Sequence, residues 1–541
     1  MRINFKHTVL GLLVLNLVVI SFCLINSPKS SLNMAGEYEI EQDEFITDLK
    51  TSSTWNFTSL IIDDTGATGN YTWSEAVALP WCSGSGTEGS PYIIDDIAIQ
   101  DQTTTCGLEI RNSNAHFLIN NSEFGYWVGQ FGIGIKLTNC TNGKLANNYF
   151  NRINYSIYLD NCNSTNLIKN KFNAVWVNAI TLNNSHNNLI NQNIIPNSFE
   201  WGISLIEGST NNIISGNIMN SNNWGIGVGG ENNEISENLL TYSDVGIMIY
   251  GNYNNISDND VLNSYYGGIE ISSSNNIISG NTINANYCGL WNSGNNNLII
   301  DNVINQNEIF GISSAYYNNS IIRNQINENI EDGLILQELN NNTISDNTIS
   351  HNGKFGIHCE SSTDVLFKHN FISRNEHQNL IITSCHNLTI LGNTIEYQSC
   401  EVNLCSNISI LANTFKDALL YLHHSNYNLI QGNTMSENRV SLSDSSYNII
   451  KSNIISVDMK LYGIYLSTYS NNNTITGNTI TYEQGGCISE DESCTGNTIE
   501  NNSCTQRIIS GFEIIVLFSS ICITSVGLIF VCKKKFMFKK F

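Results

Sequence analysis

The feature that most constrains this chain is a repeat of about 22 residues that runs through most of its 541 residues. Phrases such as IISGNIM, ISDNDV, IISGNTI, ISDNTI and ITGNTI share one asparagine. Such self-similarity is typical of a solenoid, in which each unit stacks on its neighbours. Aligning on the shared asparagine gives 18 anchor positions, which are Asn121, Asn148, Asn170, Asn193, Asn217, Asn238, Asn259, Asn281, Asn302, Asn324, Asn347, Asn370, Asn393, Asn413, Asn433, Asn453, Asn478 and Asn497.

Apolar residues keep fixed places relative to the anchor. The third residue before it is Leu, Ile or Phe in every repeat but the last, where it is Cys494, and the second residue after it is apolar in every repeat but the first. A helical solenoid needs 33 or more residues per unit, whereas three short strands fit in about 22. The sequence therefore predicts an all-β fold, a single parallel β-helix of about 18 rungs and on the order of 85 Å long.

The anchor asparagine is interpreted as structural. Asparagine tolerates a left-handed corner, and stacked amides hydrogen-bond along a ladder. In this register Ile299 stacks between two isoleucines, so Ile299→Ala should cost about 2–5 kcal/mol. Asn302→Ala should cost about 1–2 kcal/mol, and Ser279→Ala, which faces outward, no more than about 0.5 kcal/mol.

The two ends of the chain carry targeting signals. Residues 1–25 combine early basic residues with an apolar run, which fits a signal peptide or an N-terminal anchor. Residues 508–532 end in an uninterrupted run of 19 uncharged residues, 514–532, and precede the lysine-rich tail 533–541. This order predicts a transmembrane helix with a cytoplasmic tail. We therefore expect a cell-membrane protein with a single C-terminal span and the bulk of the chain extracellular.

The net charge limits the classes of partner that the chain can bind. Residues 26–507 hold 46 acidic and 17 basic side chains, a net charge of −29. This excludes a nucleic-acid binder of the usual basic kind. Asn-x-Ser/Thr sites are frequent, so an extracellular chain would offer glycosylation positions.

Several of the 15 cysteines stand where rungs would bring them together. Eight residues before the anchor, a column of small residues has cysteines on adjacent rungs, and a spacing of ~4.8 Å is within reach of a disulfide. The other reading is that cysteine merely replaces serine there. A cluster of Cys487, Cys494 and Cys504 could close the C-terminal end. The disulfide candidates are Cys140 with Cys162, Cys385 with Cys405, and Cys82 with Cys106.

The N-x-I…G-I…N-N-x-I rungs resemble the right-handed parallel β-helix repeats of the pectin-lyase-like superfamily. They look most similar to NosD-like, carbohydrate-binding and sugar-hydrolase-type repeats, common in archaeal surface proteins. The segment WCSGSGTEGSPYII from Trp81 resembles the start of such proteins. The resemblance implies right-handedness, an N-terminal cap over 26–104 and β-helix repeats over 105–504. The NosD-like label also implies copper, a remote alternative because the histidines are scattered.

A charged column stands directly before the anchor, reading Glu237, Asp258, Gly280, Asp301, Arg323, Asp346 and His369 on successive rungs. As an enzyme of this superfamily, a polysaccharide lyase or glycoside hydrolase, the chain would use Asp258, Asp301, Arg323 and Asp346. Adjacent Glu237 and Asp258 could share a calcium ion, the one cofactor considered. The plainer reading is a solvated corner, where such residues are good turn formers.

A second column, close before the recurring Gly-Ile pair, contains aromatic residues: Trp201, Trp224, Tyr266 and Phe310. Exposed rings in a row could stack on sugar rings, or could simply cover a corner of the solenoid.

Two candidate functions follow from these features. The first is a membrane-anchored surface module that binds carbohydrate or another surface partner. The second is an extracellular polysaccharide lyase or hydrolase, whose acids should line a concave groove.

Overall fold

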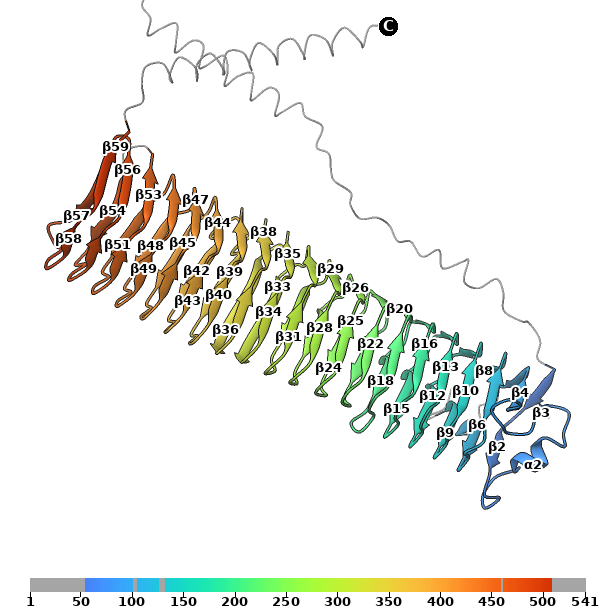
Figure 1. The fold of residues 1–541 in the computed structure, drawn as a ribbon. Helices are drawn as coiled ribbons and strands as arrows, with labels where there is room; N and C mark the ends of the chain where they lie inside the picture. The colour runs from blue at the N-terminus through green and yellow to red at the C-terminus, as the bar shows by residue number, and fades with distance from the viewer. Residues whose placement is uncertain (1–53, 101–104, 126–131, 459–460, 508–541) are drawn as a thin grey trace, which may run out of the picture. The chain divides into compact units, whose positions relative to one another are not determined.

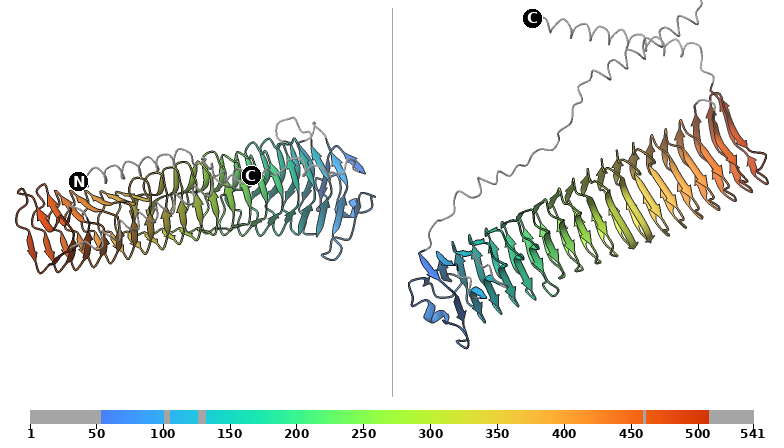
Figure 2. Two further views of the ribbon diagram at one scale, coloured as in Figure 1. Left: turned by 90° about the horizontal axis from the view of Figure 1, so that it is seen from above. Right: turned by 180° about the vertical axis from the view of Figure 1, so that it is seen from behind.

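The computed structural model describes residues 54–100, 105–125, 132–458 and 461–507. They form one solenoid of about 18 coils, almost entirely β-structure, as the repeat predicted (Figure 1). Every coil contributes one short strand to each of three parallel sheets, here named A, B and C. The chain passes from sheet B to sheet C, then to sheet A, and returns to sheet B one coil further on. Figure 2 shows the same stacking from two further sides.

Sheets A and C are built from strands of two to four residues, such as β28 (Ile277–Ser279) in sheet C and β29 (Thr282–Asn284) in sheet A. Sheet B has longer strands. They are β2 (Leu60–Asp63), β6 (Cys106–Arg111), β9 (Ile133–Thr138), β12 (Tyr155–Asp160), β15 (Asn178–Asn183), β18 (Trp201–Leu205), β21 (Trp224–Val228), β24 (Val245–Ile249), β27 (Gly267–Ile271), β30 (Cys288–Asn292), β33 (Phe310–Tyr317), β36 (Asp332–Asn340), β39 (Ile357–Glu360), β42 (Leu380–Thr383), β45 (Cys400–Asn403), β48 (Leu420–His423), β51 (Val440–Ser443), β54 (Tyr462–Ser467) and β57 (Gly486–Glu490).

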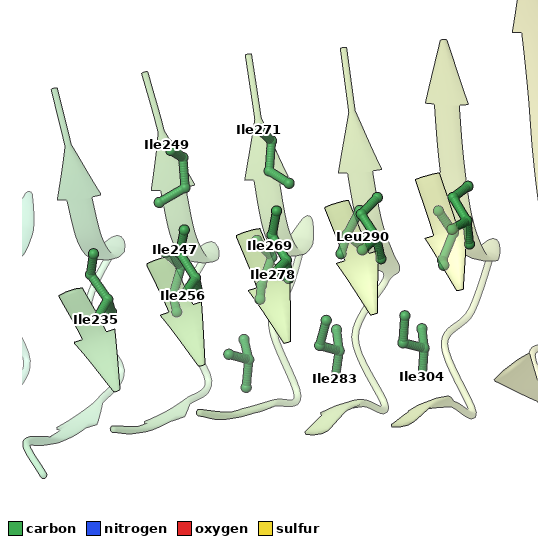
Figure 3. Close-up of a cluster of buried hydrophobic side chains, with 14 of the residues drawn as sticks. Ile235, Ile247, Ile249, Ile256, Ile269, Ile271, Ile278, Ile283, Leu290 and Ile304 are labelled. Carbon is green, nitrogen blue, oxygen red and sulfur yellow. The ribbon is translucent and has the colours of Figure 1, made fainter. Parts of the chain in front are cut away.

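The core consists of isoleucine columns. Ile278 pairs with Ile299 and Ile299 with Ile321 on successive strands of sheet C, and all three are at most 1% exposed. Ser279, the next residue along, points outward and is half-buried, as the register predicted. Figure 3 shows part of this core, to which each sheet contributes one apolar side chain or more per coil. Burying such columns on every coil supplies the main driving force for folding.

Asparagine ladders hold all three corners of the coil. The predicted ladder lies between sheets C and A, where Asn302 Nδ2 donates to Asn324 Oδ1 at 3.0 Å. A second lies between sheets B and C, with Asn276 N–H donating to Asn297 Oδ1. A third, which the sequence analysis missed, lies between sheets A and B, and contains Asn307. Each ladder satisfies buried backbone groups at turns, where no strand partner is available.

The left-handed corner belongs to a different residue from the one predicted. Asp301 has a φ of 57°, whereas the anchor Asn302 is not left-handed. From Asn148 onward the positive φ recurs at the residue before each anchor, including Glu237, Asp258, Gly280, Arg323, Asp346, His369 and Gly392. The anchor is therefore asparagine because its amide bridges coils, and the position before it tolerates many residue types because it faces solvent.

The recurring glycine before the sheet B isoleucine is required by close approach between coils. A Cβ added at Gly289 would lie 2.2 Å from the carbonyl oxygen of Gly311, and one at Gly225 would lie 2.3 Å from that of Gly246. No side chain fits at these distances. The glycines let neighbouring coils pack at the point where the chain enters sheet B.

The register at the two terminal anchors differs from the prediction. Ser122, not Asn121, occupies the first ladder position, because its N–H donates to Asn148 Oδ1. At the other end the partner of Asn478 is Asn502, while Asn497 belongs to the ladder between sheets B and C. This explains why the apolar positions relative to the anchor were occupied by other residues in the first and last repeats.

The N-terminal end of the solenoid is closed by a cap. A short helix, α2 (Trp73–Ala76), begins with a capping box made by Thr72 and Glu75. Trp73 packs onto the first coils, stacking on Tyr92 at 4.6 Å, and its Nε1 donates to Ser113 Oγ at 2.9 Å. The last coil, by contrast, ends with the exposed strands β58 (Thr498–Glu500) and β59 (Ser503–Gln506).

One disulfide is present in the described residues, between Cys487 and Cys504 at the C-terminal end, where a cysteine cluster was predicted. The other candidates, Cys82, Cys106, Cys140, Cys162, Cys385 and Cys405, are free thiols in this structure. Cys140 and Cys162 do occupy the same corner on successive coils, and Thr141 and Asn163 beside them form a bridge. Their pairing under oxidising conditions stays a prediction.

Within the described ranges no helix is long and apolar enough to cross a membrane. The predicted signal or anchor segment 1–25, the transmembrane helix 508–532 and the basic tail 533–541 lie outside the described residues.

Candidate functional site: an aromatic face on sheet B

Large aromatic side chains gather on the outer side of sheet B and on the turns that flank it. In a typical five-residue strand of sheet B, such as β18, the third and fifth residues are buried in the core, and the first and fourth are more exposed. We call this surface the aromatic face. Its members are Trp176, Phe199, Trp201, Trp224, Tyr250, Tyr266, Tyr287, Trp291 and Phe310.

In its first part the rings stack in pairs along the solenoid axis. Trp201 and Trp224 are register partners on β18 and β21, with ring centroids 5.0 Å apart. Trp176 and Phe199 stack at 4.9 Å in the preceding turns and are 50% and 52% exposed. The ring of Trp201 lies against Gly227 on the next coil, where a Cβ would be 2.4 Å from the ring. The rings of the aromatic face thus pack on the backbone of sheet B on one side and are open to solvent on the other.

In its second part the predicted column is shifted by one residue. Gly267, not Tyr266, pairs with Val245 and Cys288, because the chain has two consecutive glycines there. Tyr266 stands in the turn just before and is 62% exposed. Phe310 is only 8% exposed and meets Trp291 edge-on at 6.4 Å. Trp291, which is half exposed, therefore presents the ring that was predicted at Phe310.

Tyr250 completes this part of the face. Its hydroxyl donates to the Met248 sulfur at 3.3 Å, which holds the ring over the outward side of β24. Trp291 and Tyr250 were missed because the sequence search followed only columns aligned on Asn and Gly. Counting every outward position along the strands from the same register would have found Trp291.

The candidate catalytic residues lie elsewhere. Asp258, Asp301, Arg323 and Asp346 are exposed in the turns between sheets C and A, the corner that sheet B does not touch. Arg323 donates to both carboxylate oxygens of Asp301, at 2.8 and 2.7 Å. These residues occupy the solvated left-handed corner position and are not brought to the aromatic face. The calcium pair, Glu237 and Asp258, occupies the same column on adjacent coils.

Three buried thiols meet near the B–C corner. Cys359 Sγ lies 3.9 Å from Cys385 Sγ, and the Cys385 N–H donates to Cys405 Sγ. The Cys385 thiol also donates to the Thr383 carbonyl at 3.2 Å. The contact with Cys385, together with complete burial, raises the pKa of Cys359 well above its usual value. Such thiols behave as small buried groups.

Comparison with protein families gives a match to NosD, described as a periplasmic copper-binding protein. The matched segments are residues 95–266, 207–309, 229–384 and 373–510, so they overlap and together span most of the solenoid. The chain belongs to this family. The NosD-like resemblance of the repeats is thereby confirmed.

Comparison with solved structures gives matches of low identity and low TM-score. The A-module of a mannuronan C-5 epimerase from Azotobacter vinelandii is 12% identical, covers 68% of this chain and 91% of its own, and has a TM-score of 0.30. DFA-IIIase from Arthrobacter chlorophenolicus is 13% identical, covers 54% of this chain and 94% of its own, and has a TM-score of 0.33. The Dettilon tailspike protein is 13% identical, with 64% and 62% covered and a TM-score of 0.30. No curated protein matches the chain. At these identities the likenesses say nothing of what this chain binds.

Copper, which the family description names, needs converging His, Cys or Met ligands. In the part of the chain that the structure describes, no three His, Cys, Asp or Glu side chains are placed to hold a metal ion. The thiols of Cys359, Cys385 and Cys405 come together, but all three are buried, and those of Cys385 and Cys405 donate to backbone carbonyls. The described residues of this NosD member therefore do not match a copper-ligand set.

Proposed function

We propose that this protein is a glycan-binding β-solenoid that acts outside the cytoplasm, holding a polysaccharide along the aromatic face. The observation that carries the proposal is the run of exposed and partly exposed rings on successive coils along sheet B, from Trp176 to Trp291. Sugar rings have apolar faces that stack on such side chains. The predicted C-terminal anchor would keep the solenoid at the membrane surface.

The regular spacing supports a polymeric ligand. Coils follow one another at ~4.8 Å, so rings on neighbouring coils repeat along the axis as the units of a polymer do. A structural role explains only part of the pattern. Trp201 covers Gly227 and Phe310 is buried, but Trp176, Phe199, Tyr266 and Trp291 each leave 50–62% of their surface in solvent.

The test is a glycan-array screen of the full-length chain in detergent, followed by titration with the best ligand. Trp224→Ala and Trp291→Ala should each weaken binding about tenfold or more, because each removes a stacking ring. Tyr427→Ala is the matched control. Tyr427 stacks on Tyr447 at 5.0 Å in the turns between sheets B and C, and is 63% exposed, so it presents an open ring away from the aromatic face. The proposal fails if no glycan binds, or if the control variant loses as much affinity as the other two.

A further inference from the structure

The aromatic face lies in a part of the chain that lacks positive charge. From Phe172 to Ile322 the sequence contains no lysine or arginine, but eleven aspartates and glutamates. Every member of the aromatic face falls inside this stretch. A ligand that lies along the face therefore meets a negative potential, which no lysine or arginine between Phe172 and Ile322 offsets.

One of these acids, Glu270, lies within the face itself. It is the fourth residue of β27 and points outward, with Met248 as register partner on one side and Trp291 on the other. A Cβ added at Gly267 would be 2.8 Å from Glu270 Oε1, so the carboxylate occupies the space that a side chain at Gly267 would fill. Glycine at this position makes room for the carboxylate in a row where the neighbouring coils carry Val245 and Cys288.

No partner within the protein accounts for this carboxylate. It is half-buried, yet in the described ranges no side chain forms an ion pair or hydrogen bond with it. Burial raises the pKa of Glu270, and its negative charge adds to the burial that raises the pKa of Cys288 to about 11. A partly desolvated carboxylate costs stability unless a positive group comes to meet it.

We propose that the aromatic face binds a glycan with free amino groups, and that Glu270 pairs with the ammonium group of an amino sugar. The inference rests on the proposed function and narrows its ligand class. An ammonium group at Glu270 would gain an ion pair and would also lie beside the rings of Trp291 and Tyr250, which attract cations. A uronate or sulfated glycan would place its charges against acids alone, and a neutral glycan would leave Glu270 unpaired.

The experiment compares three oligomers of equal length on the full-length chain by titration calorimetry: hexamers of glucosamine, N-acetylglucosamine and galacturonate. Each is measured with EDTA and again with calcium, because a calcium bridge is the one route by which a uronate could bind acidic side chains. The glucosamine hexamer should bind about tenfold tighter than the acetylated hexamer, the effect expected of one charge-assisted contact. The galacturonate hexamer should bind most weakly.

Two matched variants separate Glu270 from net charge. Glu270→Gln keeps the shape and should remove most of the preference for glucosamine, while leaving affinity for the acetylated hexamer nearly unchanged. Glu234→Gln removes the same charge from sheet C, on β22 (Glu234–Ser236), and should keep the preference. Trp291→Ala should weaken both amino-sugar hexamers.

The outcomes are distinct. Equal binding of the two amino-sugar hexamers, tighter binding of galacturonate, or an unchanged preference in Glu270→Gln would each overturn the inference while leaving glycan binding intact. Failure of all three hexamers and of the wider array to bind the unmodified chain would instead overturn the proposed function.

Discussion

Replacing Asn302 by alanine should destabilise the solenoid as much as removing a core isoleucine. The side-chain amide of Asn302 donates to the carbonyls of Ile278 and Ile300 and to Asn324 Oδ1, at 2.9–3.0 Å. Its oxygen accepts from the backbone and side-chain N–H groups of Asn281, at 2.9 and 3.0 Å. The residue is fully buried, so water cannot replace these partners.

The magnitude follows from those contacts. Five contacts share two amide protons and one oxygen, and each hydrogen bond contributes about 0.5–1.5 kcal/mol net. The buried N–H of Asn281 also loses its acceptor, which costs a further ~1–3 kcal/mol. We expect Asn302→Ala to cost about 3–5 kcal/mol, comparable with Ile299→Ala and above the 1–2 kcal/mol that the sequence alone suggested.

The assay combines urea unfolding with hydrogen exchange, because a solenoid can open locally before it unfolds as a whole. In Asn302→Ala, exchange should rise at the Asn281 amide and in the adjacent coils, while coils near the N-terminal cap stay protected. Ser279→Ala is the control, since its side chain points outward from the same coil as Asn281. A cost for Asn302→Ala within about 0.5 kcal/mol of this control would refute the reasoning.

Three further predictions test other parts of the coil. Gly289→Ala should lower the free energy of unfolding by about 1–3 kcal/mol in urea titrations, because its Cβ would collide with the Gly311 carbonyl. Lys169 has a φ of 55°, so Lys169→Val should cost about 1–2 kcal/mol and Lys169→Gly should cost less, measured in the same way. Removing the Cys487–Cys504 disulfide with serines should speed hydrogen exchange in the last coil only.

The fold could be predicted from the sequence because each coil repeats the same contacts. Ile299 and Ser279 lie where the period placed them, inward and outward. The errors of register came where the repetition stops. Ser122 and Asn502 begin and end the main ladder, but a coil with neighbours on one side has weaker sequence constraints.

The candidate site could be predicted only in part. Trp201 and Trp224 stand in a column that repeats over several coils, so alignment found them. Trp291 and Glu270 each occur once in their column, between unlike residues, and no periodic signal marks them. Their importance depends on side-chain burial and on the space left by the missing side chain at Gly267, which the structure reveals.

The cap contacts of Trp73 have a consequence for how the chain is assembled. The ladder asparagines are nearly interchangeable, so a coil wound one repeat out of phase would find almost the same partners. The residues of an internal coil therefore do little to specify its position in the order of coils. The bond from Trp73 to Ser113 and its stacking on Tyr92 occur in one place and have no counterpart further along. Since this end also leaves the ribosome first, we expect it to set the phase of winding for all coils that follow.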